Sequence, residues 1–261
     1  MAEPDNKLEI LRYSRQIVLK GFGEAGQEKL KAAKVLVAGV GGLGSPALLY
    51  LAAAGVGTLG IADFDTVTFS NLNRQILHFT NDIGRPKTDS AAAKIACLNP
   101  EVRVEKYNLR LNAANTMKIL ADYDVIIDAT DNFTARYLIS DCGYFLKKPV
   151  IEGAAIGYDG ILITIIPGKT PCYRCLYPAP SEDGILPAYS DTGILGMTAG
   201  IIGSIQALEA VKLILGIGET VSGRILNFDA YKTAFREIPW RRRPECPLCG
   251  ERPTIHSPVE H

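Results

Sequence analysis

The chain has 261 residues, of which 47% are hydrophobic and 25 are glycine, as expected for a globular α/β protein. Lys plus Arg and Asp plus Glu both number 28, so no basic surplus favours a nucleic-acid partner. The polar N-terminus lacks a secretory apolar core, and no uninterrupted apolar run reaches membrane length. We therefore expect a cytoplasmic protein with no membrane partner.

The first 33 residues predict short helical pieces over 7–26, interrupted by glycines, and a helix over 27–33. They carry a basic cluster, Arg12, Arg15 and Lys20. Such residues most often form a solvated helix face, so the pattern alone gives them no role.

A glycine-rich loop follows a predicted buried strand. Residues 35–38 are apolar and rich in valine, and the loop Gly39-x-Gly41-x-x-Gly44 leads into an apolar helical pattern over 45–54. Strand, glycines and helix in this order are typical of a nucleotide-binding βαβ unit. Glycine lets the backbone approach a phosphate, and the helix N-terminus attracts its charge.

A second predicted strand, 58–62, ends at Asp63, 19 residues after Gly44. A carboxylate at this place can accept hydrogen bonds from ribose hydroxyls. The alternative is a strand-to-helix turn that binds nothing, but strand, loop, helix, strand and acid occur in the order that nucleotide binding requires.

The polar stretch 70–75 predicts a loop or irregular helix near the nucleotide. Pro86 then suits the first turn of a helix that runs to about Leu98. Lys87 lies at the start of that helix, where a cation is unfavourable unless an anion accompanies it. It is either a phosphate-binding lysine or an exposed lysine, and the pattern does not separate the two.

Asp131 lies just past a predicted strand, 125–128, which follows a strand over 102–107 and a helix over 113–120. Ligands of open α/β sheets bind at that edge, where a carboxylate can hold Mg²⁺ or position a nucleotide. Asp131 could also be the N-cap of the next helix, 133–145, and the two roles are compatible.

The alternation of strands and helices fails after a fifth strand, 149–155. A turn over 158–160 and a strand over 161–166 predict antiparallel strands that extend the parallel sheet. A long loop over 176–192 precedes a core helix over 196–215. The last predicted strands are 224–228 and 232–238.

Four of the six cysteines form two Cys-x-x-Cys pairs, Cys172 with Cys175 and Cys246 with Cys249. Two such pairs complete a closed tetrahedral Cys₄ zinc site, which would be structural. Redox chemistry is the alternative, but it needs only one pair. The remaining cysteines, Cys97 and Cys142, are most simply buried thiols.

The histidines His78, His256 and His261 are too scattered to suggest a catalytic site.

These motifs together resemble the MoeB/ThiF/HesA family, the bacterial relatives of ubiquitin-activating enzymes. The resemblance runs from about Arg12 to Cys249. It rests on RYSRQ at 12–16, the glycine loop, DFD at 63–65, SNLNRQ at 70–75, GRPK at 84–87, DATDN at 128–132 and both thiol pairs. The family's fold is a Rossmann-like α/β sheet, mainly parallel and extended by antiparallel strands, with a C-terminal Cys₄ zinc site.

The resemblance implies an adenylyltransferase that uses ATP and Mg²⁺. Its substrate would be a ubiquitin-like sulfur-carrier protein with a C-terminal Gly-Gly, whose last carboxylate becomes an acyl-adenylate as pyrophosphate leaves. The carrier could serve molybdopterin, thiamine or another sulfur pathway.

The resemblance also implies roles for single residues. Gly41 and Gly42 would lie against the nucleotide, Asp63 would bind ribose, and Asp131 would lie near Mg²⁺. The catalytic set would be Arg15, Arg74, Lys87 and Asp131, with Arg15 reaching the ATP site of the partner subunit in a homodimer. The nucleotide-binding set would be Gly39, Gly41, Gly42, Gly44, Asp63, Asp65, Ser70, Asn71, Asn73, Arg74, Gln75, Lys87, Asp131 and Asn132.

Family members that capture the carrier covalently use a cysteine in the long loop. Residues 189–193 read Tyr-Ser-Asp-Thr-Gly, so we expect adenylation without capture. We expect a single adenylation domain over 1–261, with no appended sulfurtransferase domain. It would comprise an N-terminal helical segment (1–33), a nucleotide-binding part (34–156) and a carrier-binding, zinc-containing part (157–261).

Three other functions share some of these features. An NAD-dependent dehydrogenase shares the glycine loop but leaves Arg74, Lys87 and the thiol pairs unexplained. A non-enzymatic scaffold for a carrier would not need the four implied catalytic residues. A different acyl acceptor, a peptide or a modified tRNA base, stays open within the superfamily.

Overall fold

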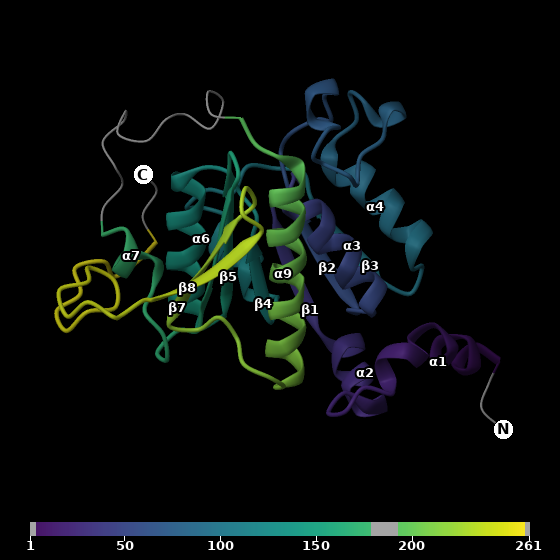
Figure 1. Cartoon of the computed structure of the whole chain (residues 1–261), viewed down its shortest axis with the longest axis horizontal. Helices are drawn as coiled ribbons and strands as arrows, with labels where there is room; N and C mark the ends of the chain where they lie inside the picture. Colours follow the sequence, from purple (N-terminus) through teal and green to yellow (C-terminus); the bar gives the residue numbers. More distant parts are fainter. Residues whose placement is uncertain (1–3, 179–192, 259–261) are drawn as a thin grey trace.

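The computed structural model describes residues 4–178 and 193–258. Its centre is one eight-stranded sheet, whose arrangement is shown in Figure 1. The strand order is β3-β2-β1-β4-β5-β6-β7-β8. The strands are β1 (Lys34–Ala38), β2 (Thr58–Ala62), β3 (Arg103–Tyr107), β4 (Val125–Asp128), β5 (Val150–Ile156), β6 (Asp159–Ile165), β7 (Arg224–Asp229) and β8 (Ala234–Pro239). The first five pair in parallel and β6, β7 and β8 pair antiparallel, which confirms the predicted fold class.

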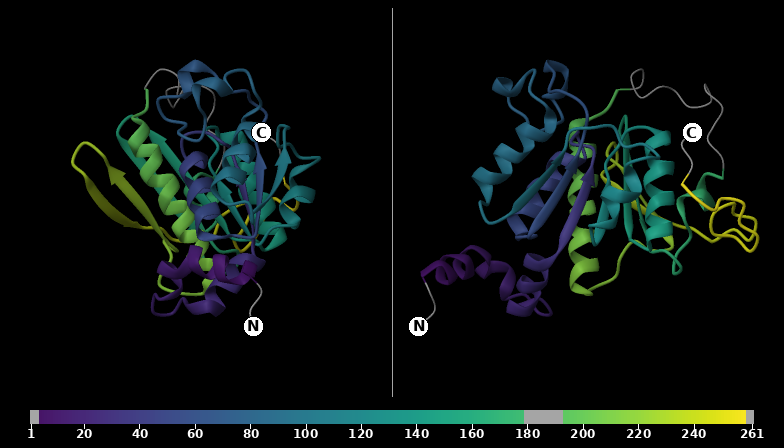
Figure 2. Two further views of the ribbon diagram at one scale, coloured as in Figure 1. Left: turned by 90° about the vertical axis from the view of Figure 1, so that its right-hand side faces the viewer. Right: turned by 180° about the vertical axis from the view of Figure 1, so that it is seen from behind.

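Helices cover both faces of the sheet (Figure 2). The helices are α1 (Pro4–Ile17), α2 (Gly23–Ala32), α3 (Gly44–Ala54), α4 (Lys87–Leu98), α5 (Thr116–Ala121), α6 (Phe133–Leu146), α7 (Tyr173–Leu176) and α9 (Gly196–Leu215), with 3₁₀ turns η1 (Phe69–Asn71) and η2 (Thr80–Asp82). Helices α3, α4 and α9 pack on one face, and α5 and α6 on the other. This division follows from the alternation of side chains along each strand.

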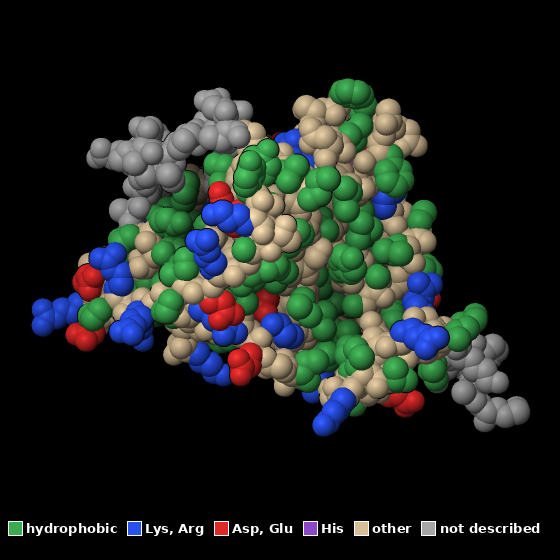
Figure 3. Space-filling view, viewed as in Figure 1, with side chains coloured by type: hydrophobic (Ala, Val, Ile, Leu, Met, Phe, Trp, Pro, Cys, Tyr) green, Lys and Arg blue, Asp and Glu red, His purple; other side chains and the backbone are tan. Residues whose placement is uncertain are grey.

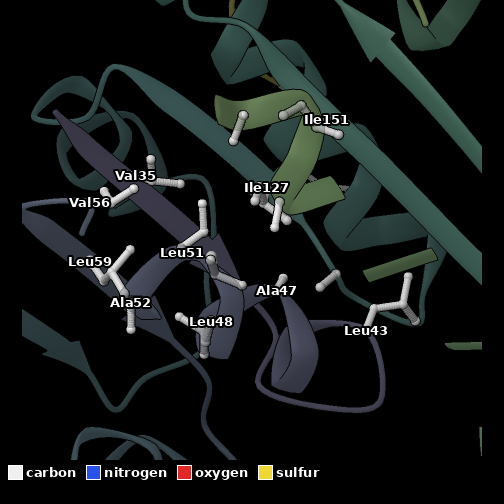
Figure 4. Close-up of a cluster of buried hydrophobic side chains, with 14 of the residues drawn as sticks. Val35, Leu43, Ala47, Leu48, Leu51, Ala52, Val56, Leu59, Ile127 and Ile151 are labelled. Carbon is white, nitrogen blue, oxygen red and sulfur yellow. The ribbon is translucent and has the colours of Figure 1, made fainter. Parts of the chain in front are cut away.

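The two sides of β1 show this alternation clearly. Val35 and Val37 face α3 and α9, whereas Leu36 and Ala38 face α6, and all four are fully buried. Figure 4 shows Val35 beside Leu51 in the first of these layers. Because both faces are covered, β1 is apolar throughout its interior, as buried parallel strands require.

Helix α9 is long and apolar enough to cross a membrane, with a mean hydropathy of 1.4. It packs instead against α3 and the β4–β6 part of the sheet, with nine of its 20 residues buried. The core helix predicted for 196–215 is therefore confirmed.

The N-terminal helices differ from the prediction of short pieces. One continuous helix, α1, extends to Ile17, and α2 begins at Gly23 rather than at residue 27. Gly26 does not break α2, because its lack of a Cβ makes room for the Phe22 ring, which would lie 3.1 Å from such an atom. Glycine at this position therefore serves packing.

Helix α1 extends away from the body of the protein (Figures 1 and 2). It is anchored through Tyr13, which is buried and whose hydroxyl accepts a hydrogen bond from Asn99 Nδ2 at 2.8 Å. Gln16 Nε2 also donates to Ala54 O at 2.8 Å. The rest of α1 exposes apolar residues, among them Leu8 and Leu11.

One cysteine departs from the prediction. Cys142 is fully buried, as expected, but Cys97 is exposed near the end of α4. That helix buries only one stripe of residues, and Cys97 lies outside it.

Candidate functional site

A pocket of about 820 Å³ lies at the carboxyl ends of the parallel strands. The chain leaves β1 towards β2 on one side, and β4 pairs with its other side, so the strand order reverses there. Such a reversal opens a crevice in which α/β proteins bind ligands. The pocket is lined by Gly39, Gly41, Gly42, Leu43, Ala62, Asp63, Phe64, Asp65, Arg74, Gln75, Lys87, Leu109, Arg110, Leu111, Ala129, Thr130, Asp131, Asn132, Thr134, Ala135, Arg136, Ala155, Gly193 and Ile194.

The glycine loop forms one wall of the pocket. Gly39 has a φ of +91°, and a Cβ there would lie 2.6 Å from the Ala129 carbonyl oxygen. A Cβ on Gly44 would lie 2.0 Å from Gly39 O, so Gly44 permits the close turn into α3 but does not itself line the pocket. Gly41 and Gly42 are partly exposed and face it. Both positions therefore offer backbone to a ligand.

Asp63 holds this wall in place from the end of β2. Its Oδ2 accepts a hydrogen bond from Val40 N at 2.8 Å, and its Oδ1 accepts one from Asp65 N at 2.8 Å. Each carboxylate oxygen has a second lone pair, so both remain able to accept a ligand hydroxyl.

Lys87 is a buried cation at the pocket floor. Its residue is only 6% exposed, and its ammonium lies 2.9 Å from Asp65 Oδ2. The alternative of an exposed helix-start lysine is therefore wrong. A buried ammonium needs an anionic partner, and the partly exposed Asp65 carboxylate supplies one beside the pocket.

The segment 70–75 contributes fewer pocket residues than expected. Arg74 and Gln75 line the pocket, whereas Ser70, Asn71 and Asn73 are absent from its lining. Arg74 Nη1 donates to Ser70 O at 3.0 Å and to Asn73 Oδ1 at 3.3 Å. These neighbours therefore hold the Arg74 guanidinium.

Asp131 is exposed at the pocket rim beyond β4. The cap of α6 is its neighbour Asn132, whose Oδ1 accepts a hydrogen bond from Ala135 N at 2.9 Å. The suggestion that Asp131 is the N-cap is therefore wrong. Its carboxylate carries no capping duty.

Two arginines of the pocket, Arg110 and Arg136, had no signal in the sequence. Arg136 is buried, and its Nη2 donates to Thr130 O at 2.9 Å and Gly153 O at 3.2 Å. Arg110 lies over the ring of Phe64, with its guanidinium carbon 4.2 Å from the ring centroid. Arg136 lies within a predicted helix, and Arg110 lies between a predicted strand and a predicted helix, so no local pattern marks either of them.

Two buried carboxyl groups lie behind the pocket. Asp128 and Glu152 are paired in register on β4 and β5. Asp128 Oδ1 accepts from Thr130 N and Thr130 Oγ1, at 2.9 and 2.6 Å. Burial, and then the charge of Asp128, raise the pKa of Glu152 well above its usual value. Burial therefore favours the protonated form of Glu152.

Arg15 is absent from the pocket lining. It is exposed near the C-terminal end of α1, the helix that projects from the body. The structure of one chain therefore does not bring Arg15 to the site with Arg74 and Lys87.

The four cysteines of the two thiol pairs form one buried cluster. Their sulfur atoms all lie within 4.8 Å of one another, with Cys172–Cys246 and Cys175–Cys249 separations of 3.4 Å. A tetrahedral ion with four 2.3 Å bonds to sulfur separates its ligands by about 3.8 Å. The donor set and its spacing therefore fit one metal ion.

The cluster joins two distant parts of the chain, and α7 and the C-terminal segment lie side by side there (Figure 1). Between the first two cysteines, Arg174 forms a buried ion pair with Asp141 of α6. Its Nε and Nη2 donate to Asp141 Oδ1 and Oδ2 at 2.9 and 2.8 Å. This ion pair fixes the segment with Cys172 and Cys175 to helix α6, which packs on the sheet.

Comparison with known proteins gives a consistent result. The ThiF family profile matches residues 13–248. The chain is 44% identical to the "Sulfur carrier protein adenylyltransferase" of Thermus thermophilus, over 98% of this chain and 96% of that protein. It is 46% identical to the "SAMP-activating enzyme E1" of Haloferax volcanii, over 92% of this chain and 88% of that protein.

Longer relatives and solved structures match as well. The chain is 47% identical to "Adenylyltransferase and sulfurtransferase MOCS3" of Arabidopsis thaliana, over 95% of this chain but 54% of that protein. Among structures, E. coli MccB with ATP shares the fold at a TM-score of 0.78 and 24% identity, over 92% of this chain and 74% of that one. PaaA shares the fold at a TM-score of 0.76 and 27% sequence identity, over 90% of this chain and 75% of that one.

Proposed function

The chain belongs to the ThiF family of ATP-using adenylyltransferases, and from this premise we propose that it adenylylates the C-terminal glycine of a ubiquitin-like sulfur-carrier protein. The observation that carries the proposal is the convergence of cations with a glycine loop. Arg74 and the buried Lys87 line the same pocket as Gly41 and Gly42.

The reaction needs positioning more than proton transfer. The carrier's terminal carboxylate attacks the α-phosphorus of ATP, a carboxylate–phosphorus bond forms, and the bond to pyrophosphate breaks. The attacking group is already ionised at neutral pH, so no general base is required. Cations that stabilise charge on the phosphate oxygens and on leaving pyrophosphate supply the acceleration.

The pocket residues divide this work. The loop at Gly41 and Gly42 offers backbone N–H groups to phosphate, and Asp63 accepts from the ribose hydroxyls. Lys87 and Arg74 hold the charged phosphates, with Lys87 exchanging part of its Asp65 contact for the nucleotide. The remaining predicted nucleotide contacts are Gly39, Asp65, Gln75 and Asn132.

Asp131 is the proposed magnesium ligand. Its carboxylate is exposed at the pocket rim and is free of helix capping. Oxygen ligands of this kind suit Mg²⁺, which when bound neutralises charge on the phosphates.

A homodimer completes the site in this proposal. Arg15 lies on the projecting helix α1 and outside its own pocket, so its guanidinium suits a role in the partner subunit. The planar fork of arginine pairs well with phosphate oxygens and stays charged. Exposed apolar residues of α1, such as Leu8 and Leu11, favour burial against a second copy.

The carrier would dock on the antiparallel part of the sheet. Tyr158 and Tyr231 are exposed there and contact each other edge to face, with centroids 5.5 Å apart. Leu195 N donates to Gly157 O at 3.0 Å, which joins this surface to Ile194 in the pocket wall. The flexible Gly-Gly tail of the carrier would run from the surface at Tyr158 and Tyr231 into the nucleotide pocket.

Zinc is the proposed occupant of the cysteine cluster. Four buried cysteine sulfurs are a soft donor set that suits Zn²⁺, and binding of the ion would hold them as thiolates. The closest sulfur contacts join one Cys-x-x-Cys pair to the other, which favours a shared metal over two redox pairs.

Adenylation without covalent capture is also part of the proposal. The loop that carries a capturing cysteine in some relatives has none between 176 and 194 in this sequence. Its segment 189–192 falls outside the described residues, so this point rests on residue identity alone.

The test is ATP–pyrophosphate exchange with a purified carrier. Capture from cell extract with ATP identifies a small protein ending in Gly-Gly, and that protein should stimulate exchange by the enzyme. The matched control is the same carrier without its last glycine, which should give none. Exchange driven equally by the truncated carrier, or by a peptide or tRNA in its place, would reject the proposed acceptor.

A further inference from the structure

His78 is buried against the glycine loop, although no motif in the sequence assigns it a role. It is only 3% exposed. Its Nε2 lies 3.0 Å from Val40 O, and its Nδ1 lies 2.9 Å from Ser90 Oγ. One imidazole therefore joins the loop, the segment that carries Arg74, and helix α4, which carries Lys87.

The chemistry of these partners fixes the ring's tautomer. A carbonyl oxygen only accepts, so Nε2 carries the proton that Val40 O receives. Burial, and secondarily the nearby Lys87 ammonium, lower the pKa of His78, so the ring is neutral. Nδ1 is then the acceptor nitrogen, and it lies 2.9 Å from the Ser90 hydroxyl oxygen.

The hydrogen bond to Val40 O also orients the next N–H group. The Val40 carbonyl and the Gly41 N–H belong to one planar trans peptide, so they point in opposite directions. With the carbonyl held by His78, the Gly41 N–H points away from the histidine, on the side where Gly41 lines the pocket. Within residues 4–178 and 193–258, no hydrogen bond is made by Gly41 N.

This orientation needs a lock because the loop is rich in glycine. Gly39 and Gly41 flank Val40, and glycine tolerates the φ values that a rotated peptide would need. The preceding peptide is already held, since Val40 N donates to Asp63 Oδ2. His78 holds the following peptide, between Val40 and Gly41, through the Val40 carbonyl oxygen.

We propose that His78 is a positioning residue that fixes the Val40–Gly41 peptide so that the Gly41 N–H faces a phosphate of ATP. The inference rests on the proposed placement of ATP in this pocket. His78 is absent from the pocket lining, so it would not touch a nucleotide bound there. Its effect is confined to the phosphate end, because Gly41 offers its N–H there.

The experiment compares two ligands on two variants by equilibrium binding. His78→Leu removes the donor at similar size, and His78→Gln keeps an N–H donor near the position of Nε2. His78→Leu should weaken ATP binding about tenfold, the value of one charge-assisted hydrogen bond. Its affinity for adenosine, which has no phosphate, should match the wild type, and His78→Gln should restore most ATP affinity.

Leu30→Ala is the control for lost stability, since Leu30 is buried in α2 away from the pocket. Its ratio of ATP to adenosine affinity should stay at the wild-type value. An unchanged ratio in His78→Leu, or no rescue by His78→Gln, overturns the inference. Wild-type protein that binds no ATP would instead reject the proposed function itself.

Discussion

Asp128 and Glu152 occupy the same register position on β4 and β5, so two buried carboxyl groups face one another behind the nucleotide pocket. Neither Glu152 carboxyl oxygen has a hydrogen-bond partner among the described residues, and Asp128 Oδ2 also lacks one there. Only one of the two groups can carry a charge without strong repulsion, and burial selects Glu152 to keep its proton.

The Glu152→Gln variant should therefore become more stable than the wild type as pH rises. The folded state holds the Glu152 proton above the pKa of an unfolded glutamate, so it binds more protons than the unfolded state. Its free energy of unfolding then falls with rising pH above about 4.3, by up to about 1.4 kcal/mol per pH unit. Urea unfolding from pH 5 to 8 should show this slope in the wild type and a smaller slope in the variant.

Glu209→Gln is the matched control for that comparison. Glu209 is also buried, but its Oε2 accepts from Thr164 Oγ1 and Val221 N at 2.6 and 2.7 Å, and its other oxygen pairs with Lys212. Because the Glu209 carboxylate makes these hydrogen bonds and this ion pair, Glu209→Gln should lower the stability of the protein. Equal pH slopes in the wild type and Glu152→Gln would show that Glu152 ionises freely.

The purified protein should contain about one zinc per chain, as a closed four-cysteine site implies. Cys172→Ser should lose the metal and lower the melting temperature, because a buried ligand disappears. Cys97→Ser should keep both, since that cysteine is exposed and distant in sequence from the cluster. Elemental analysis and thermal melting measure the two effects, and metal-free wild-type protein purified without chelator would contradict the assignment.

Asp131→Asn should lower ATP–pyrophosphate exchange by about 10²-fold, the scale for losing one electrostatic stabiliser. Stability should hardly change, because Asn132 and not Asp131 caps α6. Asp122→Asn, at the exposed C-terminal end of α5, is the control and should exchange normally. Wild-type exchange by Asp131→Asn across a magnesium titration would remove its proposed role.

Arg15→Ala and Lys87→Ala should each be nearly inactive alone and should complement each other when mixed. In a mixed dimer one site keeps both residues and the other loses both. Random pairing makes about half of the dimers mixed, so about a quarter of wild-type activity should return.

Subunit exchange in that mixture is verified by native mass spectrometry. A mixture that exchanges subunits yet stays inactive would mean that Arg15 does not act on the partner subunit's site.

Strong local patterns explain the elements that could be predicted. The strands at 58–62 and 125–128 and the helix at 196–215 match the structure to the residue, because apolar runs there end at turn-forming or polar residues. The glycines of the N-terminal segment predict breaks between helices, which is wrong at Gly26, because that residue lies inside α2 and serves packing.

The site was predictable where a motif is contiguous. Asp63, Arg74, Lys87 and Asp131 line one pocket with Gly39, Gly41 and Gly42, while the roles that the resemblance implies for them stay predictions. His78 could not be recognised, because its partner Val40 is 38 positions away and only the fold brings them together. Glu152 likewise depends on strand pairing, which no local pattern encodes.

The surface offers a further contrast with local sequence. Hydrophobic side chains gather over α3, α4 and α9 on the face shown in Figure 3. Tyr50, Phe79 and Leu208 are exposed on the protein although each lies in or beside an apolar stretch. Which of these hydrophobic side chains are exposed depends on how the helices pack against the sheet. Residue type alone does not predict it.

The central place of β1 determines when the pocket can form as the chain is synthesised. β1 pairs with β2, the next strand in the chain, but its other neighbour is β4, and Lys34 N donates to an Asp124 oxygen 90 residues away. Pairings that close such long stretches form late, because loop closure costs entropy. A nascent chain that ends before β4 therefore carries its glycine loop without the opposite wall, and nucleotide cannot assist its early folding.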